Sequence, residues 1–323
     1  MKERFLSCIF GSFTLLFSFF LLGSFQKRLP NPVVISLLQP VPEAEGGGGL
    51  FVHDLDSDGR MDIVVTSNGH IGAYRISGKP LWVRKVNIRL FDFLHHPSAI
   101  AGDLDGDKKE EVAYLTDDQK IIFLDGKTGV VKKVLSVEGK PIAMVIANLR
   151  GLGDREIILQ YSQTHLRAIS AEDGSLLWET HEYRGIEHSP LRQADLDGDG
   201  LDEVAGANVI DHDGTKMNRW EYEDNWESMD SIVIADIVPG DPLEVALAEQ
   251  RGANSHTVVV NSDRIVFKTL NPWNWEDPDK LAVGDFDPNS PGLEIFNRSS
   301  GGDGTAPQRQ RGTLSGGTGP LGA

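Results

Sequence analysis

Cysteine is almost absent from this chain: among 323 residues the only one is Cys8, close to the N-terminus. A disulfide framework is therefore excluded, and the fold must be stabilised without one. Basic residues are also few, 31 against 48 acidic ones, which leaves a formal net charge of −17. This balance disfavours nucleic acids and anionic membrane surfaces as partners.

Long uncharged apolar runs are lacking except for residues 5–25, which have basic residues on both sides. This run predicts an N-terminal hydrophobic helix within residues 1–26, either a signal peptide or an uncleaved signal anchor. No clean small-residue cleavage motif follows it, so both readings stay open. In either case we expect export: a secreted, periplasmic or membrane-anchored protein whose folded part lies outside the cytoplasm, with this segment as its only membrane contact.

One pattern recurs six times between Leu50 and Phe296: an apolar run, a loop of closely spaced carboxylates, and a second apolar run that begins on an acid. The first loop positions are 41–49 residues apart, at Asp54, Asp103, Asn148, Asp195, Asp236 and Asp285. Steps of this size are typical of propeller blades. The alternation around each loop predicts four short antiparallel strands per repeat. We therefore predict an all-β chain, a β-propeller of about six recognisable four-stranded blades over residues 45–300.

The spacing of the carboxylates by two has a chemical reason. Oxygens at loop positions 1, 3 and 5, a main-chain carbonyl at 7 and a carboxylate at 9 can surround one hard divalent cation, while glycine at 6 permits the turn. Without a cation these acids would repel each other strongly. Calcium is the expected cofactor, and its predicted ligands are Asp54, Asp56, Asp58, Asp62, Asp103, Asp105, Asp107, Glu111, Asp195, Asp197, Asp199, Glu203, Asp285, Asp287, Asn289 and Glu294.

An EF-hand is excluded, because the closing acid is at position 9 rather than 12 and the flanking residues form strand-like runs. Three loops depart from the full pattern. The third has Arg150 where the metal would sit, so we predict an Arg150–Glu156 ion pair in its place. The fifth, from Asp236 to Glu244, lacks the middle ligands and is expected to be metal-free, and the sixth closes one residue late.

These loops resemble the FG-GAP or VCBS type of repeat, and the resemblance covers about residues 45–297. It implies a propeller whose blades each carry a calcium loop near the inner strand. It does not imply one activity, because such propellers serve adhesion, scaffolding and catalysis alike. Residues 171–178, which end at Trp178, are also similar to the tryptophan-docking repeat of quinoprotein propellers, with looser versions ending at Trp82 and Trp220. We assign these tryptophans to packing between blades and claim no quinone cofactor.

The two ends of the predicted propeller leave its closure undecided. The sixth repeat has its acidic loop and second strand but no outer pair, and residues 301–323 form a Gly-rich tail that we expect to be disordered. Residues 27–44 are Pro-rich and contain one strand candidate, residues 33–38. Either this strand closes the ring, or the chain is a shortened relative of a seven- or eight-bladed propeller.

Function is expected at the central funnel, where the inner strands of the blades begin. His96 and His188 hold the position seven residues before the first loop acid in blades two and four, and Lys140 lies one residue earlier in blade three. The neighbouring segments are rich in His, Arg, Tyr and Trp, which suit a sugar chain through aromatic faces and a uronate through charge. The alternative, that each histidine only caps its strand by hydrogen bonding, stays open.

Two functions remain. Residues 287–294 are similar to a recurring ending in the propellers of rhamnogalacturonan lyases, which implies β-elimination across a uronate-containing glycan. That reaction needs a cation, a base and an acid, and the candidate catalytic residues are Arg184 or Lys140, His188 or His96, and Tyr183. The competing reading is a monomeric calcium-binding module that recognises a polysaccharide or a cell-surface protein without chemistry. We take the binding module as the expected function and the lyase as its alternative.

Overall fold

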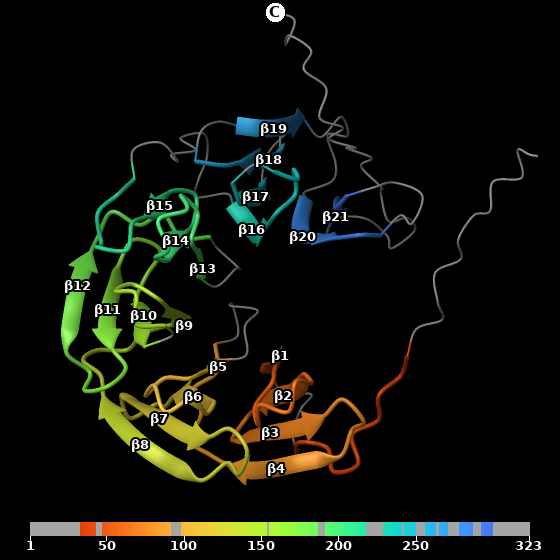
Figure 1. The fold of residues 1–323 in the computed structure, drawn as a ribbon, viewed down its shortest axis with the longest axis vertical. Helices are drawn as coiled ribbons and strands as arrows, with labels where there is room; N and C mark the ends of the chain where they lie inside the picture. Colours follow the sequence, from red (N-terminus) through yellow and green to blue (C-terminus); the bar gives the residue numbers. More distant parts are fainter. Residues whose placement is uncertain are drawn as a thin grey trace, which may run out of the picture.

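The computed structural model describes residues 33–42, 47–91, 98–153, 155–186, 191–217, 229–240, 242–249, 256–262, 265–270, 278–286 and 292–299. The regular structure of these residues is all β, in six antiparallel sheets that follow one another along the chain. The sheets lie around a common centre, with the first strand of each innermost (Figure 1). This arrangement is a β-propeller, as the repeat predicts.

Each sheet is one blade, numbered in chain order. The strands of blades 1 to 3 are β1 (Gly49–His53), β2 (Asp62–Ser67), β3 (His70–Arg75) and β4 (Pro80–Lys85); β5 (Ala99–Gly102), β6 (Glu111–Leu115), β7 (Lys120–Asp125) and β8 (Val131–Ser136); and β9 (Ala143–Ala147), β10 (Glu156–Gln160), β11 (Leu166–Ser170) and β12 (Leu176–Thr180). Those of blades 4 to 6 are β13 (Arg192–Ala194), β14 (Glu203–Ala205) and β15 (Val209–Ile210); β16 (Met229–Ala235), β17 (Glu244–Glu249), β18 (His256–Val260) and β19 (Ile265–Leu270); and β20 (Pro278–Gly284) and β21 (Glu294–Ser299).

The prediction of four antiparallel strands is confirmed for blades 1, 2, 3 and 5. Within the described residues blade 4 has three strands and blade 6 has two, the pair on either side of its acidic loop. The second strand of every blade begins on the acid that closes the loop, so the repeat boundaries follow directly from the sequence pattern.

The hydrophobic core lies between blades rather than inside any one of them. Five buried clusters each join two consecutive blades, from blades 1 and 2 through to blades 5 and 6. Successive side chains of a strand point to opposite faces of its sheet. Accordingly Val112 packs toward blade 1 whereas Ala113 packs toward blade 3. This double burial explains why the second strands are apolar at nearly every position.

The tryptophans predicted to dock one blade on the next do so where the structure describes them. The indole of Trp82 lies against Gly129 of blade 2, where an added β-carbon would be 2.6 Å from the ring, and Trp82 Nε1 donates to the Gly126 carbonyl at 2.7 Å. Trp178 of blade 3 likewise lies on Gly214, and its Nε1 donates to the His212 carbonyl at 2.8 Å. Trp220 lies outside the described residues.

Blade 2 uses a different residue for the same contact. Lys133 occupies the third position of β8, as Trp82 does in β4, and its Nζ donates to the Ala171 carbonyl of blade 3 at 2.5 Å. The ammonium also lies 4.5 Å from the centre of the Phe123 ring. The surroundings of Lys133 lower its pKa, chiefly through burial. A lysine can therefore replace the indole N–H because the acceptor is a backbone carbonyl at the blade edge.

The prediction that residues 33–38 could close the ring as a strand is wrong in this structure. These residues form no strand, and Val33 and Val34 are exposed. The segment instead lies on blade 1, where the Leu38 amide donates to the Gly78 carbonyl at 3.0 Å and the Tyr74 hydroxyl donates to the Gln39 carbonyl at 2.7 Å. These contacts hold it against the outer hairpin of blade 1, whereas a ring-closing strand would have to pair with blade 6, whose described strands are only β20 and β21.

Two further predictions fall on other parts of the chain. The N-terminal helix expected within residues 1–26 and the tail expected over residues 301–323 both lie outside the described residues. Within the residues that are described, no helix has the length and apolar character needed to cross a membrane.

Candidate functional site

The acidic loops connect the first and second strands of the blades, and all six share one contact that the sequence pattern did not reveal. One oxygen of the closing acid accepts the backbone N–H of the second loop residue, at 2.7–3.3 Å. The pairs are Asp62 with Leu55, Glu111 with Leu104, Glu156 with Leu149, Glu203 with Leu196, Glu244 with Ile237, and Glu294 with Phe286. We call this contact the loop clamp. It explains why loops that lack other metal ligands still keep the closing acid.

The loop clamp predicts a metal-independent effect in blade 3. Glu156 is fully buried, and replacing it by alanine leaves the Leu149 N–H without its acceptor. We expect Glu156→Ala to lower the free energy of unfolding by about 1–3 kcal/mol, measured by chemical denaturation. Glu156→Gln retains an acceptor oxygen and should lose less. The loss should be equal with and without calcium; a loss seen only in calcium would contradict a purely structural role.

In blade 1 a guanidinium occupies the centre of the acidic loop. Carboxylate oxygens of Asp54, Asp56 and Asp58 all lie within 4.8 Å of one another. Arg75, at the end of β3, pairs with both oxygens of Asp56 and also lies 2.9 Å from Asp58 Oδ2 and 3.4 Å from Asp62 Oδ1. The hydrogen bonds from Arg75 lower the pKa of Asp56, so this carboxylate stays ionised. Arg75 therefore neutralises part of the charge that would attract a metal.

Blade 2 has a lysine in the corresponding place. Lys132 Nζ lies 2.8 Å from Asp105 Oδ2, 3.3 Å from Asp107 Oδ2 and 2.5 Å from Glu111 Oε1. Burial alone would lower the pKa of Lys132, but its hydrogen bonds to these acids raise it. Asp103 Oδ1 is buried and has no hydrogen-bond partner among the described residues. Lys108, at the position that is glycine in the fullest loops, adopts the left-handed region with φ of 64°.

In blade 3 the predicted ion pair is confirmed. Arg150 Nη2 lies 2.8 Å from Glu156 Oε1, and Arg150 Nε donates to the same oxygen at 2.9 Å. The guanidinium thus supplies the positive charge within the loop, and the other Glu156 oxygen serves the loop clamp.

Blade 4 differs from the first three blades. Oxygens of Asp195, Asp197 and Asp199 lie within 4.8 Å of one another, and no lysine or arginine in the described part of the chain forms an ion pair with them. Glu203 is fully buried, and its Oε1, the oxygen not used by the loop clamp, has no hydrogen-bond partner among the described residues. Burial, together with the nearby carboxylates, raises the pKa of Glu203 to about 8. This loop has the strongest physical need for a cation.

The remaining two loops offer fewer described ligands. In blade 5 both Ile237 and Val238 donate to Glu244 Oε2, at 2.8 and 3.2 Å. In blade 6 Asp285 is exposed and Glu294 holds the Phe286 amide at 2.7 Å, one residue later than in the other loops, as predicted. Of the predicted ligands in this loop, Asp287 and Asn289 lie outside the described residues.

The structure describes only some of the predicted funnel residues. Lys140 precedes β9 and is exposed, and Arg184, between β12 and β13, is half-buried. His96 and His188 lie outside the described residues.

Tyr183 requires a correction. Its side chain is 1% exposed within the core between blades 3 and 4, and its hydroxyl donates to the Ala205 carbonyl at 3.3 Å. Burial raises the pKa of this hydroxyl. The side chain therefore fills the interface between blades instead of facing an open cleft, because its ring packs on Gly206, where a β-carbon would lie 2.7 Å away.

Residues 54–132, which span the acidic loops of blades 1 and 2, match the model of the FG-GAP-like repeat. Among curated proteins the chain is 24% identical over 321 aligned residues to rhamnogalacturonan endolyase YesW of Bacillus subtilis. This alignment covers 77% of this chain and 51% of that protein. It is 25% identical to rhamnogalacturonan exolyase YesX of the same organism, over 58% of this chain and 42% of that protein. The chain thus spans about half the length of the curated relatives it matches.

Solved structures agree with the fold. Saccharomyces cerevisiae Sqt1 is similar with a TM-score of 0.52 at 12% identity, covering 77% of this chain and 68% of that one. The V. cholerae biofilm matrix protein Bap1 is similar with a TM-score of 0.50 at 22% identity, covering 74% of this chain and 42% of that one. At these identities the likeness concerns the fold alone.

Proposed function

We propose that this β-propeller with FG-GAP-like repeats is an exported calcium-binding module that engages a polysaccharide at its central funnel. The observation that carries the calcium part is the blade 4 loop, where three carboxylates converge and a buried Glu203 oxygen has no hydrogen-bond partner among the described residues. The relatives support the choice of ligand, since both are named for rhamnogalacturonan.

Calcium suits the blade 4 loop because a hard cation prefers several oxygen ligands. Asp195, Asp197, Asp199 and Glu203 would hold it, and the ion would supply the positive charge that Arg75 and Lys132 supply in blades 1 and 2. In those two blades a calcium ion would compete with, or share its ligands with, the resident side chain. We therefore rank blade 4 as the tightest of the predicted calcium sites.

The polysaccharide part rests on charge near the starts of the inner strands. Lys140 and Arg184 come from consecutive blades, one before β9 and one between β12 and β13. Two cationic side chains there suit the carboxylate of a uronate, whereas a neutral glycan would accept only weaker hydrogen bonds from them. Export rests on the apolar N-terminal run, and the chain's strong negative charge accords with a calcium-binding surface.

Binding is tested by retention of the full chain on immobilised rhamnogalacturonan in calcium. We expect retention that falls at least about tenfold in the double variant Lys140→Ala, Arg184→Ala, since charge-assisted contacts are each worth about 1.5–3 kcal/mol. Lys79→Ala is the matched control, because Lys79 is exposed on the outer hairpin of blade 1. Equal retention of all three proteins would refute the funnel as the binding site, and no retention by the unmodified chain would refute the polysaccharide ligand and direct attention to a protein partner.

The alternative function is a lyase, and the names of the two relatives favour it specifically. Lys140 or Arg184 would neutralise the uronate, and His188 or His96 would take the proton; Tyr183 is no longer assigned the acid role because it is buried. Incubating the full chain with soluble rhamnogalacturonan in calcium distinguishes this case, since β-elimination produces an unsaturated sugar with a new ultraviolet absorbance. An absorbance rise that disappears in His188→Ala would establish the lyase, and retention without any rise supports the binding module.

A further inference from the structure

The outer strands of blade 3 carry a group of imidazole and carboxylate side chains that neither the acidic loops nor the funnel uses. His165 immediately precedes β11, Glu179 lies in β12, and His181 follows shortly after β12. In the β11–β12 pairing Leu166 is opposite Thr180 and Arg167 is opposite Glu179, which places His165 opposite His181. Because side chains alternate along a strand, His165, Glu179 and His181 share one face of the sheet with Arg167, and Leu166 and Thr180 lie on the other.

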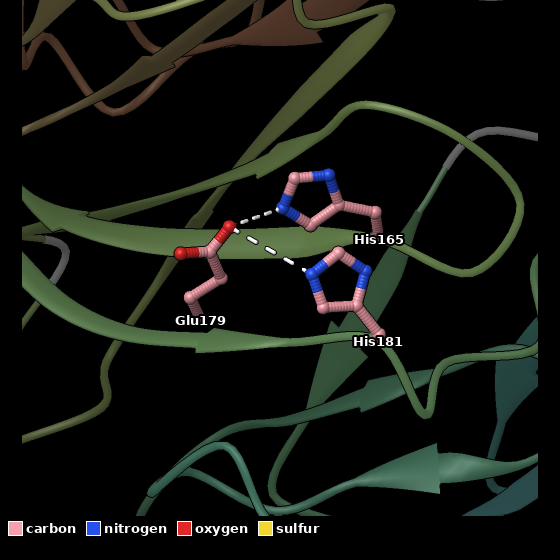
Figure 2. A group of neighbouring side chains, drawn as sticks. All are labelled: His165, Glu179 and His181. Carbon is pink, nitrogen blue, oxygen red and sulfur yellow. Dashed lines mark hydrogen bonds and ion pairs between the residues drawn. The ribbon is translucent and has the colours of Figure 1, made fainter.

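The ligand atoms of this group converge (Figure 2). His165 Nε2 is 2.6 Å and His181 Nε2 is 4.0 Å from the same Glu179 Oε1, and the three atoms lie within 4.8 Å of one another. The imidazole rings stack with centroids 4.2 Å apart and planes 22° apart, so both Nε2 atoms face the carboxylate from one side. Two imidazole nitrogens and one carboxylate oxygen form the ligand set of many zinc sites, whereas calcium prefers oxygen alone.

Neighbouring side chains hold the group in place. The Tyr161 ring stacks against His165 at 4.9 Å between centroids, and the Tyr161 hydroxyl donates to the Glu138 carbonyl at 2.7 Å. The orientation of the His165 ring is therefore set before any ion arrives.

Arg167 is the competing cation, and it has a second partner. Its Nε donates to Glu179 Oε1 at 2.9 Å, and its Nη1 donates to Glu138 Oε2 at 3.0 Å. An ion that binds at Glu179 Oε1 weakens the first contact but leaves the second. Access is open, since the His181 side chain is 69% exposed and that of Glu179 is 31% exposed.

We propose that His165, Glu179 and His181 bind a divalent transition-metal ion of the zinc class on the outer strands of blade 3. Water completes its coordination, which leaves an exchangeable position on an accessible surface. This site is separate from the calcium loops in ligand chemistry and in place, and it does not depend on the polysaccharide proposal.

The test is calorimetric titration of the full chain with zinc chloride, in saturating calcium so that the acidic loops are occupied. We expect one zinc ion per chain, with the affinity reduced at least about tenfold in His181→Ala and binding abolished in the double variant His165→Ala, His181→Ala. Because His181 is exposed, its variant should fold normally, which circular dichroism checks. His70→Ala is the control, as His70 is a histidine of blade 1 whose Nδ1 lies near the Asn68 carbonyl.

Two further readouts separate coordination from general surface binding. Arg167→Met should bind zinc more tightly because it removes the competing cation, and cobalt in place of zinc should give the visible absorption bands of a tetrahedral site. No zinc binding by the unmodified chain, or binding that the double histidine variant retains, would overturn the proposal.

Discussion

Trp82→Ala is expected to lower the free energy of unfolding by about 3–5 kcal/mol. Trp82 is 6% exposed, its indole covers Gly129 of the next blade, and its Nε1 donates to the Gly126 carbonyl. Removing the ring opens a cavity between blades 1 and 2 and leaves that carbonyl without its donor. For a chain of this size the change corresponds to a fall of roughly 10 °C in melting temperature, at about 2–4 °C per kcal/mol.

Trp82→Phe separates the two contributions, because phenylalanine keeps an aromatic ring but has no indole N–H. We expect its loss to be about 1–2 kcal/mol, close to the value of one hydrogen bond plus imperfect packing. If Trp82→Ala lost no more stability than a surface substitution, within about 0.5 kcal/mol, the tryptophan would not join the blades and its role would have to be sought elsewhere.

Calcium removal should give the second large effect. An ion that binds only the folded chain stabilises it by about 2.7 kcal/mol at one hundred times its dissociation constant. Chelation should therefore lower the melting temperature of the full chain by about 5–10 °C, at about 2–4 °C per kcal/mol. Asp195→Asn should remove most of this response, since blade 4 offers the loop without a resident lysine or arginine among the described residues. Differential scanning calorimetry with and without chelator measures both.

Asp236→Asn is the matched control, as Asp236 begins the blade 5 loop that lacks the middle ligands.

The calcium affinity should also depend on pH. Burial raises the pKa of Glu203 to about 8, so calcium binding at neutral pH displaces a proton, and the affinity should rise with pH until it levels off above that value. A melting temperature that the chelator leaves unchanged would refute the calcium proposal as a whole.

Much of the fold could be predicted because its repeat is local. Each loop places its acids, its turn and the start of the next strand within nine or ten residues, so the first two strands of blade 1 follow from the pattern alone. The Arg150–Glu156 pair was also predictable, because both residues belong to one loop. The ring-closing strand was not, since the place of residues 33–38 depends on contacts with Gly78 and Tyr74 that no local pattern encodes.

The site shows the same division. The carboxylates were found from their spacing, but the cations that meet them, Arg75 and Lys132, come from β3 and β8, so only the folded sheet brings them to the loop. The sequence does carry a signal for Arg75: it ends β3 opposite the closing acid Asp62, whereas the β14–β15 register places Asp211 opposite Glu203 in blade 4. Tyr183 was misjudged because an aromatic residue in a polar segment is as well suited to an interface between sheets as to a cleft.

The loop clamp separates the shape of each acidic loop from the identity of its inner ligands. Since a closing acid shapes each loop through a backbone amide, we expect the inner ligands of a blade to be replaceable one at a time without unfolding it. One chain then carries loops with an arginine, with a lysine and with neither, which differ in how strongly they attract an ion. Under the calcium proposal, we expect these loops to fill in steps, blade by blade, as the calcium concentration rises, rather than at a single threshold.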